Sequence, residues 1–266
     1  MRILMKKNLF ALAALAVLAA FVFTSCNASN SNVLRVGVDD SYPPMEYKDA
    51  DGKTTIGFDV DVANELAKRL GKTKVEFVSN DWTGIFAALE TDKFDVIISS
   101  VSINEERLAE HSLTDPYIAN KLVIVTEKTN TEIKAPEDLK EKKVGVQAGT
   151  TSEDFCTELI EKGNMAEANL GTYPLVTQPF LDLDAGRIDA IVVDVVVAKY
   201  YIANNKDKYT LAWESPEAEP MAFCFKKKDT ELRDKANGIL VDMQNDGTMK
   251  KISEKWFGED VTANLK

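Results

Sequence analysis

Apolar positions along this chain follow two patterns, short apolar runs and longer segments that are apolar on one side only. The run at 33–38 is mostly apolar and predicts a buried strand. Over 58–70 the apolar residues recur about every three or four positions, which is helical spacing, and Gly71 ends the segment. The first part of the chain thus predicts strands at 33–38, 75–78 and 94–98 and helices at 58–70 and 82–89.

A second round of the same alternation follows the Asp-Pro-Tyr stretch at 115–117. The acidic, proline-containing stretch 214–220 is interpreted as a connector. Alternating strands and helices favour an α/β fold with largely parallel sheets, here in two closely coupled units of roughly 100 residues each. The remaining elements are predicted as strands at 122–125, 143–146, 170–173, 188–193 and 222–225 and helices at 136–139, 151–162, 179–185, 195–203, 230–245 and 249–256.

The N-terminus has the pattern of a targeting segment. Basic residues precede an apolar run at 9–23, which is too short to span a bilayer comfortably and predicts a signal peptide over 1–25. Small residues directly before Cys26 resemble a bacterial lipobox, in which the cysteine becomes the lipidated first residue of the mature protein. The polar stretch 26–32 would then be a tether. An ordinary cleaved signal that happens to contain Cys26 is the alternative.

The charge balance limits the partners of the folded part. The formal net charge is −11, which repels nucleic-acid phosphates and anionic lipid headgroups. We therefore expect no nucleic acid partner and contact with the membrane only through the lipid anchor, on the outer side of a bacterial cell membrane. Cys156 and Cys224 could pair in an oxidising compartment or remain two buried thiols, and we favour the thiols.

The sequence lacks the residues that most catalytic and metal-binding sites require. The single histidine, His111, lies in a polar stretch where a surface position is expected, and no histidine or cysteine spacing typical of a metal site occurs. We expect no catalytic residue, metal or cofactor. The stretch 145–151 lies between a predicted strand and a predicted helix, where backbone N–H groups can bind an anion. It lacks the lysine of a phosphate loop, so a carboxylate fits better than a triphosphate.

Polar side chains gather at the carboxyl ends of the predicted strands, which is where α/β sheets bind ligands. The set contains one cation, several acids and several hydroxyl groups. A guanidinium for a carboxylate and a carboxylate for an ammonium group are what an amino-acid zwitterion needs. The residues are Asp39, Asp40, Tyr42, Ser99, Ser100, Ser102, Arg107, Thr150, Thr151 and Asp194.

Seven segments in order resemble the polar amino-acid family of extracellular solute-binding proteins (bacterial family 3), which deliver ligands to ABC importers. They are GVDDSYPPMEY (37–47), GFDVDVANELAKRLG (57–71), DVIISSVSINEER (95–107), TDPY (114–117), VGVQAGTT (144–151), GRIDAIVVD (186–194) and DGTMKKISEKWF (246–257). The resemblance covers the chain from about residue 33. It implies two Rossmann-like lobes joined by two crossing strands, the type II fold of periplasmic binding proteins. Lobe 1 would comprise 33–119 and 220–266, and lobe 2 would comprise 120–219.

The resemblance also implies a role for each site residue. Arg107 would bind the ligand α-carboxylate, with further donors from the Ser102 backbone and Thr151, and Asp194 would bind the α-ammonium group. Other contacts would come from Ser100, a lesser polar partner, from Asp39 and Tyr42 in the side-chain pocket, and from Trp82 packed on the ligand side chain.

Each role has a structural alternative. Arg107 could instead form a surface ion pair with Glu105 or Glu106, and Trp82 could be a core residue. Asp40 could be a turn residue. Glu46 is expected to be structural, and Asp59 and Asp61 are expected to favour the start of a helix electrostatically rather than to bind ligand.

The function implied is capture of a free L-amino acid for an ABC transporter permease by a monomeric binding protein that is not an enzyme. A polar or basic ligand such as lysine or arginine is favoured, and glutamine, histidine and cystine stay open. An enzyme similar to cyclohexadienyl dehydratase on the same scaffold is one alternative, and a ligand-sensing module is another.

Overall fold

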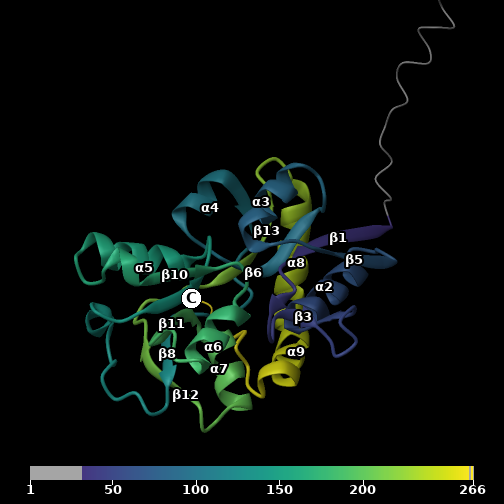
Figure 1. Cartoon of the computed structure of the whole chain (residues 1–266). Coiled ribbons are helices and arrows are strands. Elements are labelled where there is room, and N and C mark those ends of the chain that lie inside the picture. The colour runs from purple at the N-terminus through teal and green to yellow at the C-terminus, as the bar shows by residue number, and fades with distance from the viewer. Residues whose placement is uncertain (1–31, 264, 266) are drawn as a thin grey trace, which may run out of the picture. The chain divides into compact units, whose positions relative to one another are not determined.

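The computed structural model describes residues 32–263 and 265 (Figure 1). The expected signal peptide at 1–25, the expected lipidation site Cys26 and the tether up to residue 31 lie outside the described residues. No helix in the described part of the chain is long and apolar enough to cross a membrane.

One sheet is built from the two ends of the described chain. Its spatial order is β5, β1, β6, β13, β7. The three strands β5, β1 and β6 run parallel, whereas β13 is antiparallel to both of its neighbours, β6 and β7. The strands are β1 (Val33–Val38), β5 (Lys74–Ser79), β6 (Val96–Ser102), β7 (His111–Leu113) and β13 (Met221–Lys226).

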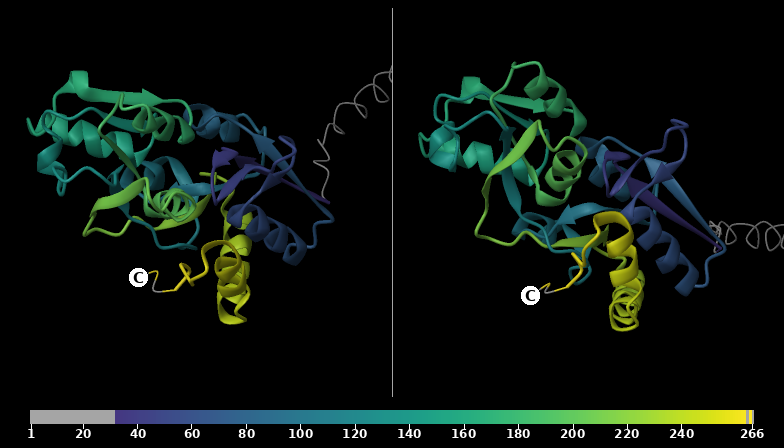
Figure 2. Two further views of the ribbon diagram at one scale, coloured as in Figure 1. Left: turned by 60° about the horizontal axis from the view of Figure 1, so that its bottom comes forward. Right: turned by 90° about the horizontal axis from the view of Figure 1, so that it is seen from below.

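Five helices accompany this sheet. The two C-terminal helices, yellow in Figure 2, pack against each other and against the first long helix of the chain. The helices are α2 (Phe58–Arg69), α3 (Trp82–Glu90), α4 (Glu105–Glu110), α8 (Thr230–Asn245) and α9 (Thr248–Phe257).

The other sheet is formed by the middle of the chain, in the order β10, β9, β11, β8, β12. The strands β10, β9 and β11 are parallel, and β8 is antiparallel to both β11 and β12. The strands are β8 (Leu122–Glu127), β9 (Val144–Gln147), β10 (Leu170–Tyr173), β11 (Ala190–Asp194) and β12 (Tyr209–Glu214). The helices are α5 (Thr151–Glu161), α6 (Thr177–Asp184) and α7 (Val195–Asn204), with 3₁₀ turns at Pro136–Leu139 and Glu167–Asn169.

The chain passes between the two sheets twice, and the two passages lie side by side. The N–H of Tyr117 donates to the carbonyl of Met221 at 2.9 Å, and the N–H of Glu219 donates to the carbonyl of Asn120 at 2.8 Å. These passages explain why each sheet is mixed rather than entirely parallel. The strand that each passage enters, β8 or β13, runs against its two neighbours, while the other four strands of each sheet run in one direction. The α/β fold with two mixed sheets is otherwise the one expected.

Local differences from the expected elements have identifiable causes. Strand β6 covers Val96–Ser102 rather than 94–98, and the Phe94 ring just before it packs beside Gly37. The small sheet of β2 (Ser41–Tyr42), β3 (Glu46–Lys48) and β4 (Thr55–Ile56) was not predicted, since strands of two or three residues show no periodicity.

Candidate functional site

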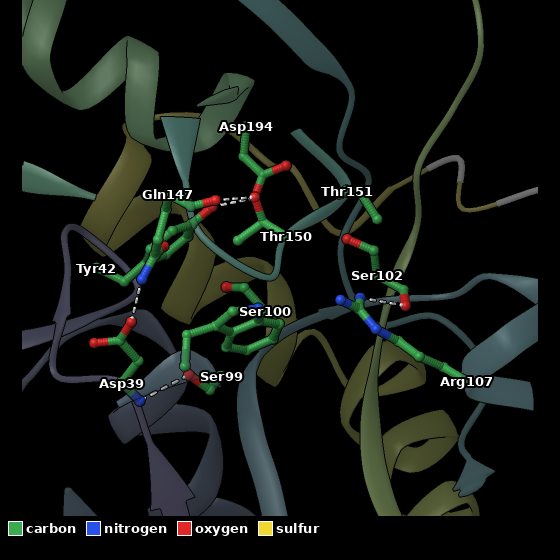
Figure 3. Close-up of a pocket in the computed structure, with 11 residues that line it drawn as sticks. Asp39, Tyr42, Ser99, Ser100, Ser102, Arg107, Gln147, Thr150, Thr151 and Asp194 are labelled. Atoms are coloured by element: carbon green, nitrogen blue, oxygen red, sulfur yellow. Dashed lines mark hydrogen bonds between the residues drawn. The ribbon is translucent and has the colours of Figure 1, made fainter. Parts of the chain in front are cut away.

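A small cavity lies between side chains carried by the two sheets (Figure 3). Of the residues expected at the site from the sequence, ten line it together with Gln147, and Asp40 does not. From the elements around the first sheet come Asp39, Tyr42, Trp82, Ser99, Ser100, Ser102 and Arg107, and from those around the second come Gln147, Thr150, Thr151 and Asp194.

Arg107 is a buried cation that forms no ion pair with a carboxylate among the described residues. Its side chain is 8% exposed, and its guanidinium carbon lies 5.3 Å from the ring centroids of both Trp82 and Phe86. Nη1 donates to the Ser102 carbonyl at 3.0 Å, and within residues 32–263 the guanidinium forms no ion pair with a carboxylate. Burial lowers the pKa of Arg107, yet an arginine keeps its charge in proteins. The alternative of a surface ion pair with Glu105 or Glu106 is therefore wrong.

The short helix α4 holds Arg107 in place. The Asn104 side chain caps this helix and accepts a hydrogen bond of 2.8 Å from the Arg107 backbone N–H. Asn104 lies only two residues after the end of β6, so α4 begins close to that end of the strand. The Arg107 guanidinium therefore lies beside Ser102, the last residue of β6.

Asp194 supplies negative charge at another wall of the cavity. It ends β11, begins α7 and is 7% exposed. Its carboxylate accepts from the Tyr42 hydroxyl and, at 2.5 Å, from Asn120 Nδ2. Burial raises the pKa of Asp194, and these two donors act against that rise. Removing a carboxylate from water is costly without a cation, so an ammonium group is a suitable guest here.

Asp39 and Gln147 meet at the side of the cavity opposite Arg107 in Figure 3. Gln147 Nε2 donates to Asp39 Oδ2 at 2.6 Å, and the Ser41 hydroxyl donates to Asp39 Oδ1 at 2.7 Å. Burial raises the pKa of Asp39. Donors and an acceptor at this end can recognise a polar or cationic ligand side chain.

Trp82 lines the cavity and also joins the two halves of the site. Its indole N–H donates to the Gly149 carbonyl at 2.7 Å, and its ring faces the Arg107 guanidinium. Thr150 and Thr151 follow Gly149 at the start of α5, and the Thr150 hydroxyl donates to the Gln147 carbonyl at 2.8 Å. Trp82 is thus neither only a core residue nor only a free aromatic platform.

Two buried acids accept hydrogen bonds from serines of the site. The Ser99 hydroxyl donates to Glu46 Oε1 at 2.5 Å, and the Ser100 N–H donates to Asp59 Oδ2 at 3.0 Å. The Tyr117 hydroxyl also donates to Asp59, at 2.7 Å. Glu46 is structural as expected, whereas Asp59 does more than favour the start of α2, because it positions the Ser100 backbone in its left-handed conformation (φ 52°).

Four other residues named from the sequence lie away from the cavity. Asp40 forms an ion pair with Lys48 and accepts from Ser79, which agrees with a structural role near the turn. His111 is buried with its ring stacked 5.2 Å from that of Phe86, so the expected surface position is wrong. The polar stretch around it forms the strand β7, which pairs with β13 and is covered there. Cys156 and Cys224 are buried and unpaired in separate hydrophobic clusters, as favoured from the sequence.

Three polar residues in or behind this site were not predicted from the sequence. Gln147 ends a strand, which is the signal that identified Asp39, but the stretch 145–151 suggested only backbone N–H groups as donors. Asn120 and Glu219 lie in the two passages between the sheets, where no helical or strand periodicity exists. Within the described residues no group of three or more histidine, cysteine, aspartate or glutamate side chains is arranged to hold a metal ion.

This chain is similar over most of its length to several amino-acid-binding proteins. The chain is 35% identical to the L-cystine-binding protein TcyJ of Escherichia coli over 230 residues, covering 86% of this chain and 84% of that protein. It is 35% identical to the histidine-binding periplasmic protein of Escherichia coli over 254 residues, covering 92% and 95%. An ancestral arginine-binding protein bound to arginine superposes with a TM-score of 0.80 at 39% identity, covering 85% and 99%.

Each of these three relatives is a binding protein and none is an enzyme, in agreement with the expectation of a binding protein rather than a dehydratase. The model of one protein family matches residues 34–259, nearly the whole described chain. This chain therefore belongs to the bacterial extracellular solute-binding proteins, family 3.

Proposed function

We propose that this chain is the substrate-binding component of an ABC amino-acid importer and that it captures a free L-amino acid in the cavity between its two sheets. The observation that carries the proposal is the buried Arg107 guanidinium, which has no carboxylate partner among the described residues and shares its cavity with Asp194. A cation and an anion held in one cavity match the two charged ends of an amino-acid zwitterion.

In this proposal the ligand α-carboxylate binds Arg107 and takes further donors from the Ser102 backbone and Thr151. The α-ammonium group binds Asp194, and Ser99, Ser100 and Thr150 complete the polar wall. The ligand side chain extends along Trp82 and Tyr42 toward Asp39 and Gln147. We favour a ligand with a long polar or cationic side chain, because a carboxylate and an amide face the far end.

Residues from both sheets must contact one ligand, so we propose that 33–119 with 220–266 and 120–219 act as two lobes that close on it. The passages near Tyr117 and Glu219 would be the hinge. A ligand that contacts both lobes favours the closed form by the contacts it gains there.

The experiment is calorimetric titration of the protein from residue 27, unfolded and refolded to remove any bound ligand, against L-arginine, L-lysine, L-glutamine, L-histidine and L-cystine. We expect tight binding of one or a few of these. Arg107→Ala should weaken it at least tenfold, because truncating one partner of a buried charge pair costs about 2–5 kcal/mol. Arg187→Ala is the matched control, since Arg187 is exposed and pairs with Asp182. Unchanged affinity in Arg107→Ala would refute the site.

For attachment, we propose cleavage of the signal peptide before Cys26 and lipidation of that cysteine. Radioactive palmitate added to producing cells should label the wild-type protein and not Cys26→Ala. Size-exclusion chromatography of the lipid-free protein should show a monomer.

A further inference from the structure

The inference concerns Glu219, which lies just behind the candidate site and does not line its cavity. Its backbone N–H donates to the Asn120 carbonyl at 2.8 Å, and the next residue, Pro220, accepts from the Ile103 N–H at 2.9 Å. The position of Glu219 is therefore fixed where the two passages between the sheets meet, near the end of β6 and the Arg107 helix.

A single amide links Glu219 to the proposed ammonium site. Asn120 Nδ2 donates to Asp194 Oδ1 at 2.5 Å and to Glu219 Oε2 at 3.2 Å. Asn120 is 2% exposed, and its own Oδ1 has no hydrogen-bond partner within the described residues. Two carboxyl groups that accept from one buried nitrogen lie close enough for each to oppose ionisation of the other.

The other groups around Glu219 offset only part of the effect of burial on its pKa. The Arg107 guanidinium lowers its pKa, as do the hydroxyls of Ser102 and Thr151, whereas Asp194 raises it. The charge of Arg107 also interacts with the carboxylates of Asp194 and of Asp154 in α5. Burial first, and then the charge of Asp194, raise the pKa of Glu219 to about 8. The Tyr42 phenol stays a donor, because burial and these acids raise its pKa as well.

We propose that Glu219 holds a proton while the site is empty and releases it when an ammonium group binds at Asp194. The O–H bond of the Glu219 carboxyl breaks, its electron pair stays on the carboxylate, and a water or buffer base takes the proton. The ligand ammonium keeps its own protons. A second groove, which Glu219 borders together with Trp213 and Glu217, connects it to solvent.

Charge balance explains why binding would drive the release. In the empty site one cation, Arg107, faces two carboxyl groups in a desolvated region. A bound amino acid adds an ammonium group beside Asp194 and a carboxylate that engages Arg107. The ligand carboxylate takes up Arg107, Ser102 and Thr151, which in the empty site lower the pKa of Glu219. In the proposal the ammonium group, which meets the acid pair directly at Asp194, outweighs this effect and ionises both acids, and the pair titrates as one coupled unit.

The inference rests on the proposed function, and calorimetry separates the two. Binding is measured near pH 7 in phosphate and in Tris, whose ionisation heats differ, with L-arginine, L-glutamine and L-cystine as probes. Histidine is avoided because its imidazole titrates near this pH. From the difference in heat between the buffers we expect release of about one proton per ligand. In the isosteric Glu219→Gln the release should fall to about zero with affinity kept within about tenfold.

Glu217→Gln is the matched control, since Glu217 is an exposed neighbour in the same segment and should leave the release unchanged. Binding without proton release in the wild type, or equal release in Glu219→Gln, would overturn the inference and leave the proposed function intact.

The proton is also measurable without ligand. In protein labelled with ¹³C at the glutamate carboxyls, one resonance should titrate with a midpoint near 8 and be missing in Glu219→Gln. Its absence from the wild type would refute the inference even if none of the three probes binds, and failure of every probe would count against the proposed function alone.

Discussion

At the scale of single residues, we propose that the far end of the cavity selects the ligand side chain. Asp39 is buried and accepts from Gln147 and Ser41, both neutral donors, and burial raises its pKa. A cationic side chain that reached Asp39 would replace a hydrogen bond from a neutral donor with an ion pair in which donor and acceptor are both charged. The charge of Asp39 therefore favours a cationic ligand over a neutral one of similar length.

Asp39→Asn tests this preference because it keeps the shape and removes the charge. We expect L-arginine to bind at least about tenfold more weakly, a loss of about 1.4 kcal/mol, and L-glutamine to be affected less. Competition calorimetry with the two ligands measures the ratio. Asp40→Asn is the control, since Asp40 pairs with Lys48 away from the cavity. An equal loss for both ligands would show that Asp39 does not select by charge.

The sequence predicts such residues only where a local pattern places them. Asp39 directly follows an apolar strand and Asp194 ends one, so the strand pattern alone brings them to the cavity. Gln147 also ends a strand, but its stretch, 145–151, predicts an anion site made of backbone N–H groups and does not single out its side chain. Asn120 and Glu219 reach the site through the pairing of two passages far apart in the chain, and nothing in their own neighbourhood encodes that pairing.

At the scale of elements, long periodic segments are predicted well and short ones are not. The helix α8 has the predicted bounds, 230–245, and α2 differs from its prediction by one residue. The six-residue helix α4 was not delimited, because about one and a half turns give too few repeats. The strand β12 was not predicted, although its apolar residues alternate at 209, 211 and 213. Its pairing with β8 has a register shift between Leu211 and Trp213.

Gly57 shows how one element boundary supports the site. It precedes α2 with φ of 143°, and an added Cβ would overlap the carbonyl oxygen of Met45. From this start α2 carries Asp59 beneath Ser100. We predict that Gly57→Ala lowers the free energy of unfolding by about 2 kcal/mol or more, because strained backbone and a steric overlap coincide.

Urea denaturation of the unliganded protein measures this loss. Gly238→Ala is the matched control, since Gly238 lies exposed within α8 with open space around its Cβ position. Alanine there should stabilise the protein by about 0.5–1 kcal/mol. A neutral result for Gly57→Ala would mean that the chain adjusts at this boundary without disturbing its surroundings.

At the scale of the whole molecule, three side chains carry hydrogen bonds from one half of the site to the other. Tyr42 donates to Asp194, Gln147 donates to Asp39, and Trp82 donates to Gly149. Two of the acceptors are the acids expected to bind ligand. The contacts between the halves and the contacts to a ligand therefore use the same groups, which would link ligand binding to closure.

Buried acids give the whole molecule a dependence of stability on pH. Burial raises the pKa of Asp59 to about 6. Burial and the Asp59 charge also raise the pKa of the neighbouring Glu46 well above its usual value. Glu219 is raised to about 8. Unfolded, such acids titrate near 4. Between these values the folded state binds more protons than the unfolded state, so stability falls as the pH rises.

We predict that the melting temperature of the unliganded protein decreases steadily from about pH 5 to about pH 8. Acids whose pKa is lowered by pairing, such as Asp51 and Asp246, titrate below this window and do not reverse the trend. Calorimetric scans at constant ionic strength measure it. Glu219→Gln should reduce the fall in melting temperature over the upper half of this pH range. The fall over the lower half, which the ionisation of Asp59 causes, should remain. A melting temperature that rises with pH over this range would show that these carboxyls are ionised in the folded protein and that its interior compensates their charge.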